Sequence, residues 1–158
     1  MTCNAIKFFV SGLPKGQPRP KAFARRFGDK WMARVYESGT AENWKSQIAA
    51  SAKLHTPEQP LTGPLRVELT FYFPRPKSHF RTGKRCAELR EDAPRHHVSK
   101  PDRDNADKAV LDALTTLGFW RDDAQVCDGR IQKLYADNGN VGCQIEICLI
   151  PDAAMPGE

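Results

Sequence analysis

The segment from Leu65 to Phe73 alternates apolar and polar side chains without interruption, and this pattern constrains the fold more than any other part of the chain. All odd-numbered positions in it are apolar, and their side chains share one face. Side chains that alternate with a period of two belong to a β-strand with one buried face. The segment therefore predicts a strand in a sheet that is apolar on one side.

A second periodic segment predicts a helix. Apolar side chains recur at the i, i+3, i+4 spacing from Ala106 to Leu117, and Gly118 follows where such a helix ends. The other predicted elements are a strand at 6–11, a hairpin at 22–36 that turns at Gly28-Asp29, a helix that Thr40 caps and that runs to about Leu54, and two strands at 126–136 and 141–149 that pair around the turn Asp137-Asn138-Gly139. Together they predict an α/β fold: one small domain over residues 1–150, with a mixed sheet and two main helices, followed by a disordered tail at 151–158.

The composition is that of an ordinary soluble domain. Of the 158 residues 40% are hydrophobic and 27% charged, and no apolar run approaches the roughly 20 residues that span a bilayer. The first residues lack the layout of a secretion signal. The five cysteines include no C-x-x-C pair and complete no zinc site with the histidines. These features predict a cytoplasmic protein with reduced cysteines and no membrane association, and they argue against a zinc or thiol enzyme.

Positive charge is concentrated in two segments of a chain whose formal net charge is +5. We call residues 14–36 the first basic arm, and residues 74–100, which show no sustained periodicity, the second basic arm. Such clusters predict an anionic partner, nucleic acid above all. The candidate DNA contacts are Lys15, Arg19, Lys21, Arg25 and Arg26 in the first basic arm, and Arg75, Lys77, Arg81, Lys84, Arg85 and Lys100 in the second.

Aromatic and histidine side chains lie among these basic residues. Phe23, Phe27 and Trp31 are predicted first as core or dimer contacts, and second as wedges against unstacked bases. His96 and His97 are interpreted as surface polar residues, with phosphate contact as the alternative.

Six aspartates lie between residues 102 and 123, directly after the second basic arm. Carboxylates repel one another, so such a cluster costs free energy unless a cation lies among them. Asp102 and Asp104 start the predicted helix, Lys108 is one turn further on, and a chain that turns back after Gly118 can bring Asp122 or Asp123 beside them. Three converging carboxylates suit Mg²⁺, which lowers the pKa of its bound water and polarises a phosphoryl oxygen.

Each of these residues also has a purely structural interpretation. Asp102 or Asp104 can cap the helix, Asp104 and Lys108 can form a surface ion pair, and Asp122 and Asp123 can occupy a simple turn. Asp107 is assigned to the electrostatics of the helix start. The residue types alone leave the metal site and the structural interpretation both open.

The order of these residues resembles the RusA family of crossover-junction (Holliday-junction) endodeoxyribonucleases. The matching residues are PDRDN (101–105), Lys108, DAL (112–114), GFW (118–120) and DDAQV (122–126). The segments PKGQPRPKAFARR (14–26) and FPRPKSHFRTGK (73–84) are similar to phage-type members. The match is thus spread over much of the chain and is most specific over about 25 contiguous residues.

The resemblance implies a homodimeric nuclease with a small mixed α/β fold that depends on Mg²⁺, with Mn²⁺ as a substitute. Such an enzyme resolves four-way DNA junctions by paired symmetric nicks in DNA recombination and repair. Carried over residue by residue, Asp102, Asp104 and Asp123 match the metal-binding carboxylates, and Lys108 matches the essential lysine. The alternatives are a junction-binding protein without catalysis and a nuclease that acts more broadly on branched or flap DNA.

Two features depart from the family pattern. Arg103 stands between the two matched aspartates, where an apolar residue is common, and it is interpreted as solvent-facing rather than DNA-binding. The second basic arm is longer than in the shortest family members, so the resemblance does not say which of its residues contact DNA.

Overall fold

The predicted strand at 65–73 lies in the middle of the sheet. The computed structural model describes residues 5–18, 21–36 (side chains at 24–33) and 41–151, and it confirms this strand as β4 (Leu65–Phe73). On one side β4 pairs antiparallel with β7 (Gly142–Leu149), and on the other it pairs parallel with β5 (Val126–Asp128) and β6 (Ile131–Tyr135). Strand β1 (Ile6–Ser11) pairs antiparallel with β7 and completes a five-stranded mixed sheet.

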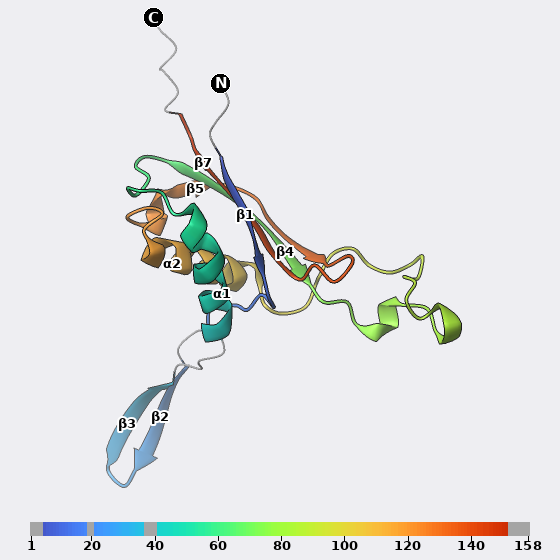
Figure 1. Cartoon of the computed structure of the whole chain (residues 1–158). Helices are drawn as coiled ribbons and strands as arrows, with labels where there is room; N and C mark the ends of the chain where they lie inside the picture. The colour runs from blue at the N-terminus through green and yellow to red at the C-terminus, as the bar shows by residue number, and fades with distance from the viewer. Residues whose placement is uncertain (1–4, 19–20, 37–40, 152–158) are drawn as a thin grey trace, which may run out of the picture.

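Helices α1 (Glu42–Ala52) and α2 (Arg103–Leu117) pack on one face of this sheet (Figure 1). α1 contacts α2 and β1, and α2 also contacts β6. All five apolar side chains of β4 are buried, together with one side of α1 and with the predicted stripe of α2 from Ala106 to Leu114, whereas Leu117 is partly buried. Gly118 ends α2 in the left-handed conformation (φ 86°), and its N–H reaches the carbonyls of Leu114 and Thr115. The fold is therefore a single mixed α/β domain with two helices, as predicted.

The start of the first helix differs from the prediction. Its N-cap is Ala41, which has no side chain that can accept a capping hydrogen bond, and Thr40 lies outside the described residues. The helix ends at Ala52, and a 3₁₀ turn, Lys53–His55, continues it past the predicted end at Leu54.

The prediction that the last two strands pair with each other is wrong. The turn between them forms as expected, because Asn138 (φ 55°) and Gly139 (φ 73°) both adopt the left-handed conformation of a tight turn. The chain nevertheless passes the end of β4 there, so β6 and β7 lie on opposite sides of β4. The predicted single strand at 126–136 is also divided, because Gly129 (φ 148°) lies so close to the carbonyl of Val67 that a Cβ would not fit.

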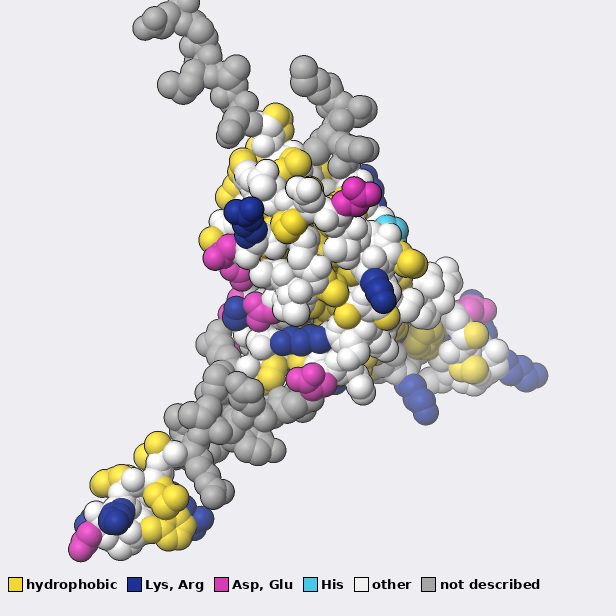
Figure 2. Space-filling model, turned by 60° about the vertical axis from the view of Figure 1, so that its left-hand side comes forward, with side chains coloured by type: hydrophobic (Ala, Val, Ile, Leu, Met, Phe, Trp, Pro, Cys, Tyr) yellow, Lys and Arg dark blue, Asp and Glu magenta, His cyan; other side chains and the backbone are white. Residues whose placement is uncertain are grey.

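The hairpin of β2 (Lys21–Phe27) and β3 (Lys30–Tyr36) projects from the body of the domain (Figure 1). Phe27 and Trp31 are 61% and 69% exposed, and apolar atoms gather on the hairpin at the lower left of Figure 2. Neither residue lies in the core, so of the two roles predicted first, core or dimer contact, only the dimer contact stays a prediction, whereas the side chain of Phe23 lies outside the described positions. An isolated two-stranded ribbon has no second layer against which to bury them.

Across the described ranges, no helix combines the length and apolarity needed to cross a bilayer. Residues 152–158, where a disordered tail is predicted, fall outside those ranges.

Candidate active site

Asp102 occupies the N-cap position of α2, but its side chain does not cap the helix. Its backbone is extended (φ −64°, ψ 152°), and its carbonyl accepts the first helical hydrogen bond, from Ala106 N at 3.0 Å. The exposed carboxylate makes no capping hydrogen bond, so the structural interpretation of Asp102 is wrong. Asp104 follows in the first turn and is exposed as well.

The two neighbouring aspartates after Trp120 have different roles. Asp122 is the N-cap of a 3₁₀ turn, Asp123–Gln125, and its Oδ1 accepts from Ala124 N at 2.8 Å. Gln125 completes this capping box and also donates to the carbonyls of Leu61 and Gly63 at 3.0 and 3.1 Å. Asp122 is therefore structural, and it fixes the backbone from which Asp123 projects.

The buried aromatic pair before these aspartates brings Asp123 back to α2. Phe119 and Trp120 are 0% and 1% exposed, and Trp120 Nε1 donates to Thr115 Oγ1 of the helix at 2.7 Å. The following turn therefore contacts α2. Packing of the GFW segment against the core is what returns Asp123 to the helix that carries Asp104.

Asp107 belongs to the same group of carboxylates, and the sequence did not reveal this. Burial raises the pKa of Asp107 above its ordinary value, and the charges of Asp123 and Asp104 raise it further, against the opposing effect of Arg103 and Lys108. These mutual effects place Asp104, Asp107 and Asp123 in one electrostatic cluster. Asp107 thus does more than interact with the helix dipole. The available signal was its position three residues after Asp104, on the same side of a helix.

Lys108 lies at the edge of this carboxylate cluster. Its Nζ donates to Asp112 Oδ1 at 3.1 Å, one turn further along α2. This hydrogen bond raises the pKa of Lys108, and Asp123 and Asp107 contribute in the same direction. The lysine is therefore charged and within electrostatic reach of two of the carboxylates. Lys108 thus pairs with Asp112, whereas the structural interpretation of the sequence paired it with Asp104.

Asp102 faces a different lysine, Lys133 of β6, which the sequence also did not reveal. Burial lowers the pKa of Lys133, and the Asp102 carboxylate opposes that shift. Lys133 Nζ donates to Ser99 O at 2.6 Å, and its carbonyl accepts from His97 N at 2.9 Å. These contacts hold the segment before α2 against the sheet, and so they position Asp102.

His97 is half-buried rather than a surface residue. Its ring stacks on Phe73 with centroids 3.9 Å apart, and burial together with Lys133 lowers its pKa, which favours the neutral imidazole. His96 is exposed, as interpreted from the sequence, and so is Arg103.

The donor chemistry of the cluster fits a hard divalent cation. Asp102, Asp104, Asp107 and Asp123 offer carboxylate oxygens, which Mg²⁺ and Mn²⁺ prefer. Within the described part of the chain, no three His, Cys, Asp or Glu side chains are already arranged around one point. The residues therefore fit the metal in the kind of donor they offer, although the described side chains do not already form a ligand set.

Replacing Asp107 tests the repulsion within this cluster. In EDTA at pH 7, Asp107→Asn is expected to raise Tm by roughly 2–4 °C, the shift that about 1 kcal/mol produces in a domain of this size, because an amide removes one of the like charges. The gain in Tm that Mg²⁺ gives the wild-type protein should shrink in the variant. Differential scanning calorimetry with Asp92→Asn as control, an exposed carboxylate paired with Arg90, measures both. A lower Tm in EDTA would contradict the repulsion.

The predicted DNA contacts lie in three places: at a cavity beside Asp102, on the hairpin of β2 and β3, and in the second basic arm. Lys15 and Lys100 are exposed and line a cavity beside Asp102. Of the hairpin residues, Arg25 and Arg26 are exposed, only the backbone of Lys21 is described, and Arg19 lies outside the described residues. In the second basic arm, Lys77 and Lys84 are exposed, Arg81 pairs with Glu88 and Glu91, and Arg85 pairs with Glu88.

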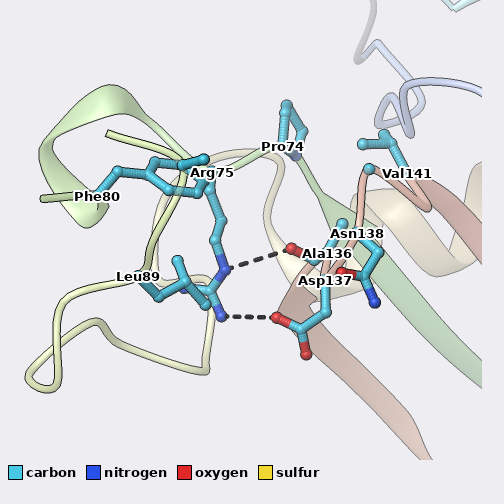
Figure 3. Close-up of a pocket in the computed structure, with 10 residues that line it drawn as sticks. Pro74, Arg75, Phe80, Leu89, Ala136, Asp137, Asn138 and Val141 are labelled. Atoms are coloured by element: carbon cyan, nitrogen blue, oxygen red, sulfur yellow. Dashed lines mark hydrogen bonds and ion pairs between the residues drawn. The ribbon is translucent and has the colours of Figure 1, made fainter. Parts of the chain in front are cut away.

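Arg75 is a structural residue and not an accessible cation. Its side chain is 8% exposed, and the guanidinium donates to Ala136 O (3.2 Å), Pro94 O (2.8 Å) and Asp137 Oδ1 (3.2 Å), which ties the second basic arm to the turn after β6 (Figure 3). Charge alone suggested a DNA contact. Because the guanidinium donates inward to protein oxygens, we leave Arg75 out of the proposed DNA-binding surface.

Removal of this guanidinium should loosen the second basic arm. Arg75→Ala is expected to lower the free energy of unfolding by about 2 kcal/mol, because a buried side chain and its three hydrogen bonds to protein oxygens are lost. Amide hydrogen exchange in residues 76–94 should accelerate at the same time. Lys77→Ala, two residues away and exposed, is the matched control and should change neither. Unchanged exchange in Arg75→Ala would show that the arm is held by other contacts.

Carboxylates beside a cavity with basic side chains, on a small α/β domain, suit a phosphodiester hydrolase, and the family match supports this class. The family model described as endodeoxyribonuclease RusA matches residues 11–147. The chain therefore belongs to the RusA family of endodeoxyribonucleases, which confirms the resemblance and the enzyme class predicted from the sequence.

Individual relatives agree with this assignment. The chain is 33% identical over 142 residues to the uncharacterized protein YqaN of Bacillus subtilis (strain 168), and the match covers 90% of this chain and 96% of YqaN. It is 55% identical over 38 residues to the crossover junction endodeoxyribonuclease RusA of Escherichia coli (strain K12), a match that covers 24% of this chain and 32% of that protein. A match of the same extent and identity joins it to the RusA protein of Enterobacteria phage 82.

Proposed function

We propose that the protein is a Mg²⁺-dependent endonuclease that resolves four-way DNA junctions by paired symmetric nicks, as a homodimer acting in recombination and repair in the cytoplasm. The observation that carries the proposal is that acidic residues at the start of α2 border the basic cavity that Asp102 lines, with Asp104, Asp123 and Lys108 within electrostatic reach of Asp107. The family relationship and the name of the RusA relatives, crossover junction endodeoxyribonuclease, support the choice of substrate.

The proposed roles follow from the chemistry of the side chains. Asp102, Asp104 and Asp123 hold the cation, which supplies Lewis-acid polarisation and an activated water when bound. Asp107 adds a further negative charge near these carboxylates, so a bound cation offsets more repulsion among them. Lys108 orients the attacking water or offsets the charge that develops on the phosphorus in the transition state. Lys15 and Lys100 hold the DNA backbone beside the cut.

A two-fold dimer suits the symmetry of the substrate. Two equivalent cuts in a junction with two-fold symmetry need two equivalent sites, which a C₂ dimer provides. The exposed side chains Phe27, Trp31 and Met32 on the hairpin supply apolar surface suited to burial in such a dimer. Light scattering after size-exclusion chromatography should therefore give twice the monomer mass of 17.7 kDa. A monomer at micromolar concentration would contradict the dimer.

One assay separates this function from its alternatives. Purified protein is incubated with labelled four-way junction, flap and linear duplex, each with Mg²⁺, with Mn²⁺ or with EDTA. We expect cleavage of the junction, at symmetric positions, with either metal and none with EDTA. Cleavage that survives EDTA would refute the metal mechanism. Junction binding without any cleavage would identify a binding protein, and equal cleavage of flaps would identify a broader nuclease.

A further inference from the structure

A preformed cavity of about 760 Å³ lies between the first basic arm and the start of α2. This volume is within the range of about 300–1,000 Å³ that is typical of small-molecule sites. Pro14 and Pro18 stiffen the wall from the arm, and Pro74 and Pro101 stiffen the opposite side, because proline fixes φ. Rigid walls of this kind lose little conformational entropy when a ligand binds.

The arm is docked directly on the helix. Gln17 N donates to Asn105 O at 2.9 Å, and a Cβ built on Gly16 would lie 3.0 Å from the Cβ atoms of both Asn105 and Pro101. Only a residue without a side chain approaches α2 this closely. The backbone that carries Gln17 is therefore held next to the start of α2, where Asp102 lies three residues before Asn105.

Two polar atoms in the wall of this cavity are buried without a hydrogen-bond partner in the described structure. They are Gln17 Oε1 and His97 Nδ1, and both residues line the cavity. A buried polar atom left unsatisfied costs about 1–3 kcal/mol, so such atoms need an explanation. An amide and an imidazole each carry donor and acceptor capacity, which is the complement of the polar edge of a nucleobase.

The remaining groups suit the rest of a nucleotide. Lys15 and Lys100 are exposed at the cavity and can contact phosphates, and the rings of Phe73 and His97 form an aromatic floor. Asp102, a proposed metal ligand, is part of the same wall. A base held here would therefore have its own phosphate beside the cation that Asp102 helps to bind.

We propose that this cavity receives an unpaired nucleobase from the DNA next to the cleaved phosphodiester, and that Gln17 and His97 read its edge. The inference rests on the proposed junction-cleaving function, and it adds the source of base preference. Extrusion of a base from a stack costs a few kcal/mol and least where pairing is already disturbed, as it is at a branch point. Cleavage should thus depend on the identity of the base beside the cut.

A fluorescent base analogue tests the binding step without any cleavage. 2-Aminopurine is placed in turn at each position around the branch point of a four-way junction, and fluorescence is recorded on adding protein in EDTA. With the wild-type protein we expect a several-fold rise at one position, because the analogue brightens when it leaves the stack. Gln17→Leu, which keeps the size and loses both polar atoms, should remove most of that rise. Gln144→Leu on β7, outside the cavity, is the matched control and should keep it.

Base preference is measured in the same variants with Mg²⁺. The four bases at the responding position should differ in cleavage rate by roughly tenfold or more with the wild-type protein and by about twofold with Gln17→Leu. His97→Phe, which keeps the stacking on Phe73, should weaken the preference as well, so that the conclusion does not depend on one variant. Circular dichroism and Tm confirm that the variants fold.

Two failures have different meanings. If no position brightens, or if Gln17→Leu brightens and discriminates like the wild-type protein, the cavity does not read a base, although junction cleavage stands. If the wild-type protein cleaves no junction with Mg²⁺, the proposed function fails, and the fluorescence in EDTA still decides whether a base enters the cavity.

Discussion

Asp104→Asn is expected to reduce junction cleavage by about 10³-fold while the affinity for the junction changes by less than about twofold. An amide of the same size removes one anionic ligand from the proposed cation site, and a divalent ion contributes several kcal/mol of transition-state stabilisation. The cationic residues proposed to bind DNA are elsewhere, at Lys15, Lys100 and the hairpin. Chemistry and binding should therefore separate in this variant.

Single-turnover rates with Mg²⁺ and junction binding in EDTA measure the two quantities. Asp128→Asn is the matched control: it removes a carboxylate that pairs with Arg66 at 2.6 Å, outside the carboxylate cluster, and it should leave both quantities near the wild-type values. A loss of binding together with cleavage in Asp104→Asn would show that Asp104 supports the fold or the DNA surface rather than the reaction.

Lys108→Ala is expected to lower the single-turnover rate by about 10²-fold with an unchanged Tm. Removal of one group that stabilises transition-state charge costs about 10²–10³ in rate in well-studied enzymes. As a surface ion pair the contact with Asp112 would be worth only about 0–1 kcal/mol. If Lys108 is catalytic, the rate of Lys108→Ala should thus be lower by an order of magnitude or more than if it only forms a surface ion pair.

Asp112 provides the control for this lysine. Asp112→Asn breaks the 3.1 Å contact and leaves the Lys108 ammonium in the field of Asp123 and Asp107, so cleavage should fall by less than about threefold. Equal losses in Lys108→Ala and Asp112→Asn would mean that the ion pair itself matters. A near-normal rate in Lys108→Ala would remove the lysine from the catalytic set.

Features that depend on neighbours in the sequence were predicted well. The apolar spacing of α2 from Ala106 to Leu114, the alternation of β4 and the turn at Asn138-Gly139 all form as expected, because periodicity and turn geometry are local properties. The pairing of β6 with β7 failed for the complementary reason. Which strand lies beside which is decided by the burial of the whole sheet, and β4 takes the place between them.

For the candidate active site, too, the local features were predicted and the contacts between distant segments were not. The motif residues were named as candidates, but the sequence could not show that the charge of Asp123 acts on Asp107, or that the charge of Asp102 acts on Lys133 of β6. It could not distinguish Arg75, whose donors are used up within the protein, from exposed cations such as Lys77. The sequence shows the charge of a side chain, whereas its accessibility to DNA depends on how distant segments pack around it.

The place of β7 in the sheet determines how late in its synthesis the nuclease can fold. Residues 142–149 separate β1 from β4, so the ribosome has to synthesise almost the whole domain before its sheet can close. Asp104 and Asp123 emerge earlier, but the core against which Phe119 and Trp120 pack is incomplete until β7 joins the sheet. A chain that stops at residue 139 is expected to stay unfolded and to leave DNA intact, so an interrupted translation product carries no nuclease activity.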